Sequence, residues 1–254
     1  MKTKRQQAIA DYINKKSSVT FSELCTKFNV SNATMRRDLV TLENHGLIER
    51  VHGGARTLST EENASPIFSQ RIVSSVDEKV RIADYAIDFI KDGDSVFLDA
   101  STTCLKLAEK IQTANLNITV ITNYFEISNL FLESENIDTI FIGGNIRIGY
   151  NSTSGSLAEQ MLYNMHTDIA FIGTDGIDAN RGLSNNRLDV IAIKKIIINN
   201  SKNVYCLADY TKFTTIAVIP FASLNDINSI ITNKELSGEI LDSYDEMKSK
   251  IICV

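Results

Sequence analysis

Apolar residues in the first part of the chain recur at helical spacing in three successive segments. Residues 4–15 carry apolar side chains on one helix face, and residues 21–28 repeat that pattern over two turns. A third helix is expected to begin after Ser31 or Asn32, both good N-cap residues, and to end at Gly46, which suits a left-handed C-terminal cap. The pattern therefore predicts helix, short helix, turn and helix.

A β-hairpin pattern follows the third helix. Residues 47–51 are predicted to form a strand, residues 52–55 a tight turn and residues 56–58 the returning strand. Residues 17–20 interrupt the helical spacing and are expected to separate the first two helices. Together these elements predict a winged helix-turn-helix, a motif that places its last helix in the major groove of DNA.

The third helix has two different faces. Met35, Leu39 and Leu42 fall on one side and are expected to pack, whereas Arg37 lies opposite them with Thr34 at its flank. Arginine can bind guanine through two hydrogen bonds, and threonine can contact a thymine methyl group. The side chains on this exposed face are therefore suited to contacts with the edges of DNA bases. The alternative for so short a helix pair is a module that dimerises or caps the larger domain.

From residue 76 onward, short apolar runs alternate with helix-like segments such as residues 77–91. The apolar runs are residues 95–98, 118–121, 139–142, 169–172, 204–207, 229–231 and 251–254. Parallel strands that are buried on both faces have this appearance, so the runs predict a mainly parallel, twisted sheet with helices on both faces. Residues 57–69 are polar and lack sustained periodicity, and a linker is expected over residues 58–75.

Small, hydroxyl-bearing and acidic residues collect just after five of these runs. Parallel sheets bind their ligands beyond the carboxyl ends of the strands. Ser101, Thr102 and Thr103 open a helix-like segment, and their hydroxyl and amide groups would suit a phosphate at the positive end of that helix. A plain N-cap is the alternative interpretation, but the recurrence at five run ends favours a ligand site.

The composition is that of an ordinary folded protein, with 43% hydrophobic and 22% charged residues among 254. No apolar run approaches the roughly 20 residues that span a bilayer, and the first residues are polar, so we expect a cytoplasmic protein with no membrane partner. The 4 cysteines are far apart, and the 3 histidines lack the spacing that brings two of them to one helix face. We therefore expect no metal site and no cofactor.

Charge is distributed unevenly along the chain. Residues 1–57 contain 10 basic and 5 acidic side chains, a net charge of +5, while the remaining residues contain 16 basic and 26 acidic side chains, a net charge of -10. The basic segment, residues 1–57, is called the head, and the acidic remainder is called the body. This division of charge indicates that the head meets a polyanion which the body repels. A solvated charged face would give the same counts.

The stretch SNATMRRDLVTLENHGLIERVHGGA, residues 31–55, resembles the DNA-binding signature of the DeoR family of bacterial sugar-metabolism repressors. The elements that carry the resemblance are T-x-R-R-D-L, L-E-x-x-G-L-I and R-x-H-G-G-A. The resemblance implies DNA contacts from the recognition helix, its cap and the wing. The residues concerned are Ser31, Asn32, Thr34, Arg36, Arg37, Arg50, His52 and Gly53. Asp38 would be structural and would orient a neighbouring arginine.

Residues 71–254 resemble the sensor domain of the same family, whose fold is shared with ribose-5-phosphate isomerase and glucosamine-6-phosphate deaminase. The matching stretches are EKVRIADYAIDFIKDGDSVFLDASTT, VITN, FIGGN, FIGTDGID and LADYTKF. The resemblance implies a phosphorylated sugar as effector, held by residues at the strand ends. Those residues are Asp99, Ser101, Thr102, Thr103, Asn123, Gly144, Asp175, Asp189 and Lys212. Ser101 stands where the family usually has glycine, and Asp189 replaces a longer acid.

The expected fold class is therefore α/β, with an N-terminal winged helix-turn-helix domain over residues 1–57 and a Rossmann-like sensor domain over residues 76–254. The expected function is repression of a carbohydrate operon, with operator DNA and a phosphorylated sugar as partners and a homodimer or homotetramer as the binding form. An isomerase or deaminase tethered to DNA by its head is the first alternative. A scaffold that senses no ligand is the second.

Overall fold

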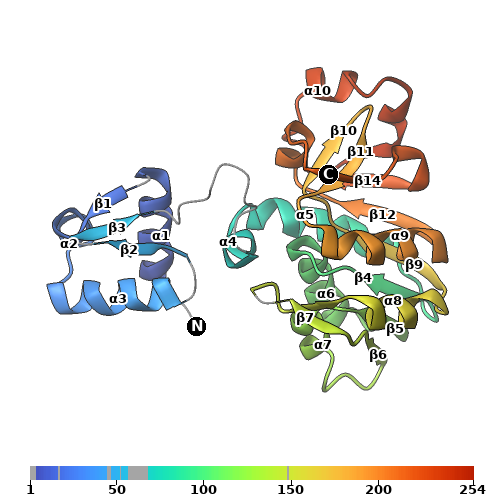
Figure 1. The fold of residues 1–254 in the computed structure, drawn as a ribbon, viewed down its shortest axis with the longest axis horizontal. Helices are drawn as coiled ribbons and strands as arrows, with labels where there is room; N and C mark the ends of the chain where they lie inside the picture. Colours follow the sequence, from blue (N-terminus) through green and yellow to red (C-terminus); the bar gives the residue numbers. More distant parts are fainter. Residues whose placement is uncertain (1–3, 17, 45–46, 52, 57–67, 148) are drawn as a thin grey trace. The chain divides into compact units, whose positions relative to one another are not determined.

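We describe a computed structural model of the chain over residues 4–16, 18–44, 47–51, 53–56, 68–147 and 149–254 (Figure 1). The chain divides into two compact units, Met1–Ser74 and Ser75–Val254. Residues 57–67 lie outside the described part. Helix α4 (Phe68–Val73) lies in the segment that we read as a linker without a periodic pattern.

Besides α4, the described part of the first unit contains three helices and a three-stranded antiparallel sheet. Its elements are α1 (Lys4–Lys16), β1 (Ser18–Thr20), α2 (Phe21–Phe28), α3 (Asn32–Asn44), β2 (Glu49–Val51) and β3 (Gly54–Arg56). Thr20 begins α2 because its hydroxyl accepts a hydrogen bond from the N–H of Glu23 at 3.3 Å, and Asn29 ends it in the left-handed conformation, with φ of 47°. The predicted helix-turn-helix is confirmed.

The sheet of the first unit has one strand more than expected. Residues 18–20 form β1 and pair with β3, which lies between β1 and β2. The first wing strand is shorter than predicted, because Leu47 and Ile48 are buried in the core before β2 begins. The returning strand β3 begins at Gly54, two residues earlier than predicted and within the predicted turn, while residues 57 and 58 lie outside the described part. A hydrophobic pattern of three residues is too short to reveal a strand such as β1, whose existence depends on its distant partner.

The second unit contains a seven-stranded sheet that matches the seven apolar runs. Its strands are β4 (Ser95–Leu98), β5 (Ile118–Thr122), β6 (Ile137–Phe141), β9 (Thr167–Ile172), β12 (Ser201–Leu207), β14 (Ser229–Thr232) and β15 (Ile251–Cys253). All neighbouring strands are parallel, in the order β15-β14-β12-β9-β4-β5-β6. The predicted Rossmann-like α/β fold is therefore confirmed.

The strand order reverses between β4 and β9. After β4, the chain adds β5 and β6 on one side, and then crosses over to add β9, β12, β14 and β15 on the other side. In open α/β sheets the crevice for a ligand lies at the carboxyl ends of the strands where this reversal occurs. The topology therefore directs attention to the residues that follow β4 and β9.

Helices cover both faces of this sheet. They are α5 (Val76–Ala86), α6 (Thr102–Thr113), α7 (Phe125–Leu130), α8 (Ser156–Tyr163) and α9 (Ile191–Asn200), with α10 (Gly238–Asp242) near the end of the chain. Helix α6 packs against α5 and α7, whereas α8 packs against α9. Right-handed crossovers that run in opposite directions from β4 put these two groups on opposite faces.

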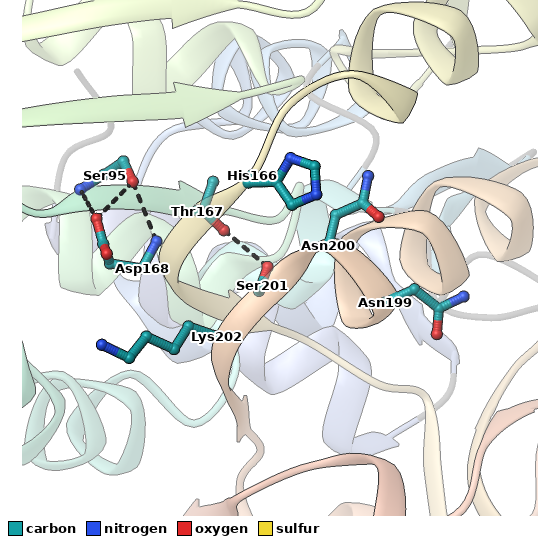
Figure 2. Close-up of a pocket in the computed structure, with 8 residues that line it drawn as sticks. All are labelled: Ser95, His166, Thr167, Asp168, Asn199, Asn200, Ser201 and Lys202. Atoms are coloured by element: carbon teal, nitrogen blue, oxygen red, sulfur yellow. Dashed lines mark hydrogen bonds between the residues drawn. The ribbon is translucent and has the colours of Figure 1, made fainter.

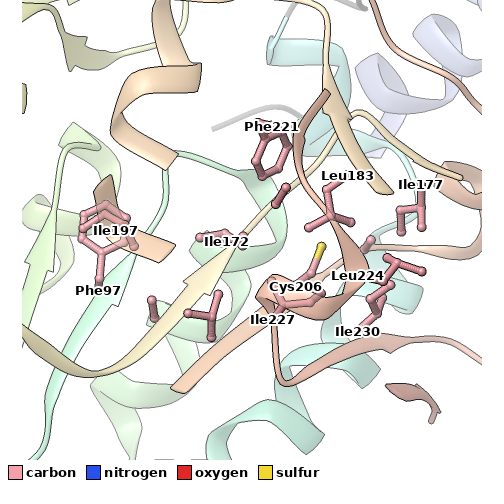
Figure 3. Packing of buried hydrophobic residues seen from close by; sticks show 14 of the residues in the cluster. Phe97, Ile172, Ile177, Leu183, Ile197, Cys206, Phe221, Leu224, Ile227 and Ile230 are labelled. Carbon is pink, nitrogen blue, oxygen red and sulfur yellow. The ribbon is translucent and has the colours of Figure 1, made fainter. Parts of the chain in front are cut away.

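One large buried cluster of the second unit lies between the sheet and the α8–α9 layer. Phe97 of β4, Ile172 of β9 and Cys206 of β12 belong to one buried cluster with Ile197 of α9, and Figure 3 labels all four side chains within it. Ile230 of β14 extends the cluster. Burial of these apolar side chains is the main force that holds the strand ends in position.

Two small antiparallel sheets were not predicted from the sequence. The first is the hairpin of β7 (Asn145–Arg147) and β8 (Ser152–Ser154), and the second consists of β10 (Gly176–Asp178), β11 (Gly182–Asn185) and β13 (Ile219–Ala222). β7 follows β6 and β10 follows β9, so both additions begin at the carboxyl ends of sheet strands.

Within the described residues, no helix combines the length and apolar character needed to cross a membrane.

Candidate functional site

Helix α3 presents the two faces that its sequence predicts. Met35, Leu39 and Leu42 are buried in the core of the first unit, whereas Arg36 and Arg37 are exposed. The apolar side fixes the helix on α1 and α2. The arginine side is left available for a partner.

The start of α3 is held by short polar side chains. The hydroxyl of Ser31 accepts a hydrogen bond from the N–H of Thr34 at 3.3 Å and lies 2.9 Å from the Thr34 hydroxyl. Asn32 accepts a hydrogen bond from the thiol of Cys25 at 3.4 Å. These three expected DNA-contacting residues thus also order the turn between α2 and α3.

Asp38 is a buried acid on the recognition helix. The residue is 4% exposed, and its carboxylate accepts hydrogen bonds from Arg5 Nε at 2.8 Å, from Arg5 Nη2 at 3.3 Å and from Gln6 at 2.9 Å. The hydrogen bond to Asp38 also raises the pKa of Arg5. The arginine that Asp38 orients therefore belongs to α1, and the carboxylate is kept away from the free face of α3.

The wing lies beside a hollow of about 590 Å³. Its lining residues are Phe21, Arg36, Leu39, Arg50, Val51, Gly53 and Gly54.

The arginines of the wing form ion pairs. Arg50 forms one with Glu43 at 2.6 Å, and Arg56 forms one with Glu49 at 2.9 Å. Gly53 occupies the left-handed region, with φ of 90°, while His52 lies outside the described residues. The two wing arginines thus already have acidic partners.

The carboxyl end of β4 leads directly into α6. Ser101 is the N-cap of this helix, and its hydroxyl accepts a hydrogen bond from the N–H of Cys104 at 3.2 Å. The first N–H groups of a helix have no partner within the helix, so those of Thr102 and Thr103 point beyond its end. This arrangement suits an anion at the positive end of a twelve-residue helix.

Asp99 and Lys194 form a buried ion pair where the strand order reverses. The ammonium of Lys194 contacts the Asp99 carboxylate and donates to the carbonyl of Gly173 at 2.7 Å. Asp99 also accepts a hydrogen bond from the N–H of Gly173 at 2.9 Å. Burial, together with the negative charge of Asp99, raises the pKa of Cys104 to about 12, so this thiol stays protonated.

Asn123 follows β5 and is 2% exposed. Its amide nitrogen donates to the carbonyl of Thr153 at 2.8 Å, which fixes the orientation of the amide. The amide oxygen is buried and has no hydrogen-bond partner among the described residues. A buried acceptor without a partner is costly in the free protein, so Asn123 is suited to a ligand that brings a donor.

Gly144 follows β6 and has φ of 135°. A Cβ atom at this position would lie 2.7 Å from the carbonyl oxygen of Ser154 and 3.1 Å from the Cβ atom of Ala158. The close approach of β8 and α8 therefore explains this glycine without a ligand.

Asp189 lies in a cluster with two arginines. Arg147 donates to Asp189 at 2.9 Å and to Ser152 at 3.0 Å, and Arg187 donates to both Asp189 oxygens at 3.1 Å. Burial alone would raise the pKa of Asp189, but the hydrogen bonds from Arg187 and Arg147 outweigh it and hold the pKa below its ordinary value of 3.8. Tyr150 lies against both guanidinium groups. Both oxygens of Asp189 are therefore already engaged.

The two remaining expected residues follow β9 and β12. Asp175 accepts a hydrogen bond from the N–H of Asn186 at 2.9 Å. Lys212 lies 4.0 Å from Asp209, whose carboxylate also accepts a hydrogen bond from the N–H of Thr211 at 3.1 Å. The topology thus brings the expected effector residues of β4, β5, β9 and β12 to one edge of the sheet.

Three residues near this edge were missed in the sequence. Lys194 lies in the apolar stretch of α9, and a lysine on the buried face of a helix is a signal that could have identified it. Arg147 and Asn185 gave no comparable signal, because they lie in the unpredicted strands β7 and β11.

A second hollow of about 430 Å³ lies at the opposite edge of the sheet, where β4, β9 and β12 begin (Figure 2). Asp168 accepts hydrogen bonds there from the N–H and hydroxyl groups of Ser95 at 3.0 and 2.7 Å, which lower the pKa of Asp168. The hydroxyls of Thr167 and Ser201 pair at 2.7 Å. These polar groups satisfy one another, so their arrangement is explained by the joining of neighbouring strands.

Comparison with known proteins covers both units. Residues 5–61 match the DeoR-like helix-turn-helix domain, and residues 74–234 match the DeoR C terminal sensor domain. The chain is 36% identical to the HTH-type transcriptional regulator IolR of Bacillus subtilis over 94% of both chains. It is 33% identical to the HTH-type transcriptional repressor GlcR of Bacillus subtilis, over 95% of this chain and 92% of that protein.

A more distant relative is the lactose phosphotransferase system repressor of Staphylococcus epidermidis, which is 29% identical over 96% of this chain and 98% of that protein. Among solved structures, ribose 5-phosphate isomerase A of Methanocaldococcus jannaschii is 23% identical over 55% of both chains, with a TM-score of 0.40.

Proposed function

Because the chain belongs to the DeoR family of DNA-binding transcriptional regulators, we propose that it represses a carbohydrate operon and leaves its operator when a phosphorylated sugar binds to the second unit. The observation that carries the first half is the free face of α3, where Arg36 and Arg37 are exposed while Met35 and Leu39 hold the helix in place. An arginine on the exposed face of such a helix would bind guanine in the major groove through two hydrogen bonds.

The wing and the start of α3 supply the remaining proposed DNA contacts. Ser31, Asn32 and Thr34 would contact the backbone or base edges near the helix start. Arg50, His52 and Gly53 would approach phosphates from the wing. Since Arg50 is paired with Glu43 in the free protein, DNA would compete with that carboxylate for the guanidinium.

The effector would bind at the carboxyl edge of the sheet. In this proposal, the N–H and hydroxyl groups of residues 101–103 hold the phosphate, and the unpaired oxygen of Asn123 accepts a sugar hydroxyl. Asp175 and Lys212 would complete the sugar contacts. Two proposed residues would act indirectly, because Asp99 holds Lys194 and Asp189 holds two arginines.

The names of two relatives support repression, and one of those names supports a carbohydrate system as its target. One relative is named a transcriptional repressor, and another is named a repressor of a lactose phosphotransferase system. Release on effector binding requires that the sugar phosphate bind one quaternary state more tightly than the other. A homodimer or homotetramer would supply such states, and would meet operator half-sites separated by whole helical turns of about 10 base pairs.

An enzyme on the same fold is the competing proposal. An isomerase or deaminase needs an acid or base whose pKa lies near neutrality. The arginine partners of Asp189 move its pKa in the opposite direction, away from neutrality. We therefore favour a ligand sensor without turnover.

Arg37→Ala tests the DNA half of the proposal. The variant should bind operator DNA about 1 to 3 kcal/mol more weakly, because it loses base contacts, and should keep its affinity for the effector. Fluorescence anisotropy with the upstream DNA of the protein's own gene gives the affinity. Arg181→Ala, at an exposed position of the second unit, is the matched control. Equal operator affinity of Arg37→Ala and the unaltered protein would exclude this register of α3.

Thr102→Asp tests the effector half. A carboxylate in the first turn of α6 is compatible with the positive helix end, so the fold should persist, but it would repel a phosphate from the same position. We expect normal operator binding and a loss of release by the phosphosugar that releases the unaltered protein. Release at the same phosphosugar concentration would place the phosphate elsewhere.

A further inference from the structure

Asn185 is a buried polar residue outside the set of proposed effector contacts. It is the last residue of β11, and the residue is 9% exposed. Its amide oxygen is buried and finds no hydrogen-bond partner within the part of the chain that the structure describes. A buried acceptor in this state destabilises the free protein, and a donor from a ligand would remove that cost.

The position of Asn185 is fixed by its two neighbours in sequence. The N–H of Asp175 donates to the carbonyl of Ser184 at 3.0 Å, and the N–H of Asn186 donates to the Asp175 carboxylate at 2.9 Å. Asp175 directly precedes β10, and these two hydrogen bonds join it to the residues on either side of Asn185. The Asp175 carboxylate therefore lies next to the end of β11, where Asn185 is the last residue.

The buried oxygen of Asn123 is another acceptor at this edge for which the described residues supply no hydrogen-bond donor. Asn123 follows β5, whereas Asp175 and Asn185 lie beyond β9, and β4 with the start of α6 separates β5 from β9. Two strand spacings correspond to about 10 Å. An elongated sugar whose phosphate lies near α6 can therefore extend hydroxyl groups toward both asparagines.

We propose that Asn185 is a specificity-determining residue of the effector site, which accepts a hydrogen bond from a hydroxyl group of the bound phosphosugar. This inference rests on the proposed function. A carboxylate accepts several hydrogen bonds, so Asp175 and Asn185 together suit two neighbouring hydroxyl groups. The effector class is thus a polyhydroxylated sugar phosphate with adjacent free hydroxyls, rather than a deoxy sugar phosphate or a small phosphate ester.

Asn185→Leu removes the acceptor while keeping the size of the side chain. The full-length protein is titrated by calorimetry with inorganic phosphate, glycerol 3-phosphate, ribose 5-phosphate, fructose 6-phosphate, glucose 6-phosphate and 2-deoxyglucose 6-phosphate. For the tightest polyhydroxylated ligand, Kd should rise about tenfold in the variant, as expected for one lost hydrogen bond. Inorganic phosphate should bind both proteins equally. Asn199→Leu, at an exposed position near the opposite edge, should change neither value.

Thermal unfolding of Asn185→Leu separates recognition from structure. The melting temperature should stay the same or rise, because an unpaired buried oxygen is replaced by an apolar group. A lower melting temperature, or unchanged Kd values for all the phosphosugars, would overturn the role of Asn185 alone. Failure of the unaltered protein to bind any of them would overturn the proposed function, and this inference with it.

Discussion

Lys194 and Asp99 place opposite charges where the second unit shields both from water. Lys194 is 4% exposed and Asp99 is 5% exposed, and both also bond to the backbone of Gly173. Such a pair is costly to form and far more costly to break, because removal of one partner leaves the other charge buried alone. The pair therefore fixes the ends of β4 and β9 relative to α9.

We expect Lys194→Met to lower the free energy of unfolding of the second unit by about 3 to 5 kcal/mol, since it leaves the Asp99 carboxylate without its cation. Adding Asp99→Asn should recover most of that loss, because the amide can still accept from Gly173 without carrying a charge. Urea denaturation followed by circular dichroism measures both values. If the double variant were as unstable as the single one, charge burial would not be the cause.

Strand β1 and strand β3 illustrate how one element depends on a single residue type. A Cβ atom at Gly54 would overlap the carbonyl oxygen of Val19, and β1 pairs with β3 through Val19 and its neighbours. The backbone of β3 can approach β1 only because position 54 has no side chain. The wing is thereby attached to the helical core of the first unit.

Gly54→Ala should therefore destabilise the first unit by about 1 to 3 kcal/mol, the usual cost of forcing one carbon into a packed contact. Operator affinity should fall with it, since the wing loses its support. Gly238→Ala is a matched control, because no atom lies within 4 Å of the Cβ that it adds. Thermal unfolding gives the melting temperature of each variant, which is compared with that of the unaltered protein. Equal melting temperatures would mean that β1 and β3 separate freely.

The sequence predicts elements well where burial is two-sided. All seven strands of the large sheet appeared as apolar runs, because parallel strands with helices on both faces contain few polar positions. β7 and β8 were not predicted, because Asn145–Arg147 and Ser152–Ser154 carry almost no apolar pattern and depend on contacts beyond their own segment. Arg147 and Asn185 were not predicted for the same reason. Lys194 was not predicted because lysine side chains are usually exposed.

At the scale of the whole molecule, each unit has its own buried core. The first unit packs α1, α2 and α3 around one apolar cluster, and the second packs its sheet against α8 and α9 around another. The two parts also differ in charge, with a net +5 over residues 1–57 and -10 over the rest. Such a division assigns DNA binding to one unit and sensing to the other.

A fragment of residues 75–254 should accordingly fold without the head. We expect it to unfold cooperatively on heating, to be stabilised by the same phosphosugar as the full chain, and to have no affinity for the operator. Differential scanning calorimetry and anisotropy measure these properties. A fragment that shows no melting transition would indicate that the second unit needs the first in order to fold.

The ion pairs of the wing have a consequence for the way the head responds to ionic strength. Arg50 must leave Glu43, and Arg56 must leave Glu49, before either can bind a phosphate. Each exchange leaves a free carboxylate near the DNA, so the two arginines add less net positive charge to the complex than two unpaired arginines would. Fewer condensed cations would be displaced from the DNA. The logarithmic decline of affinity with added potassium chloride should then be shallower than the ten basic side chains of the head suggest.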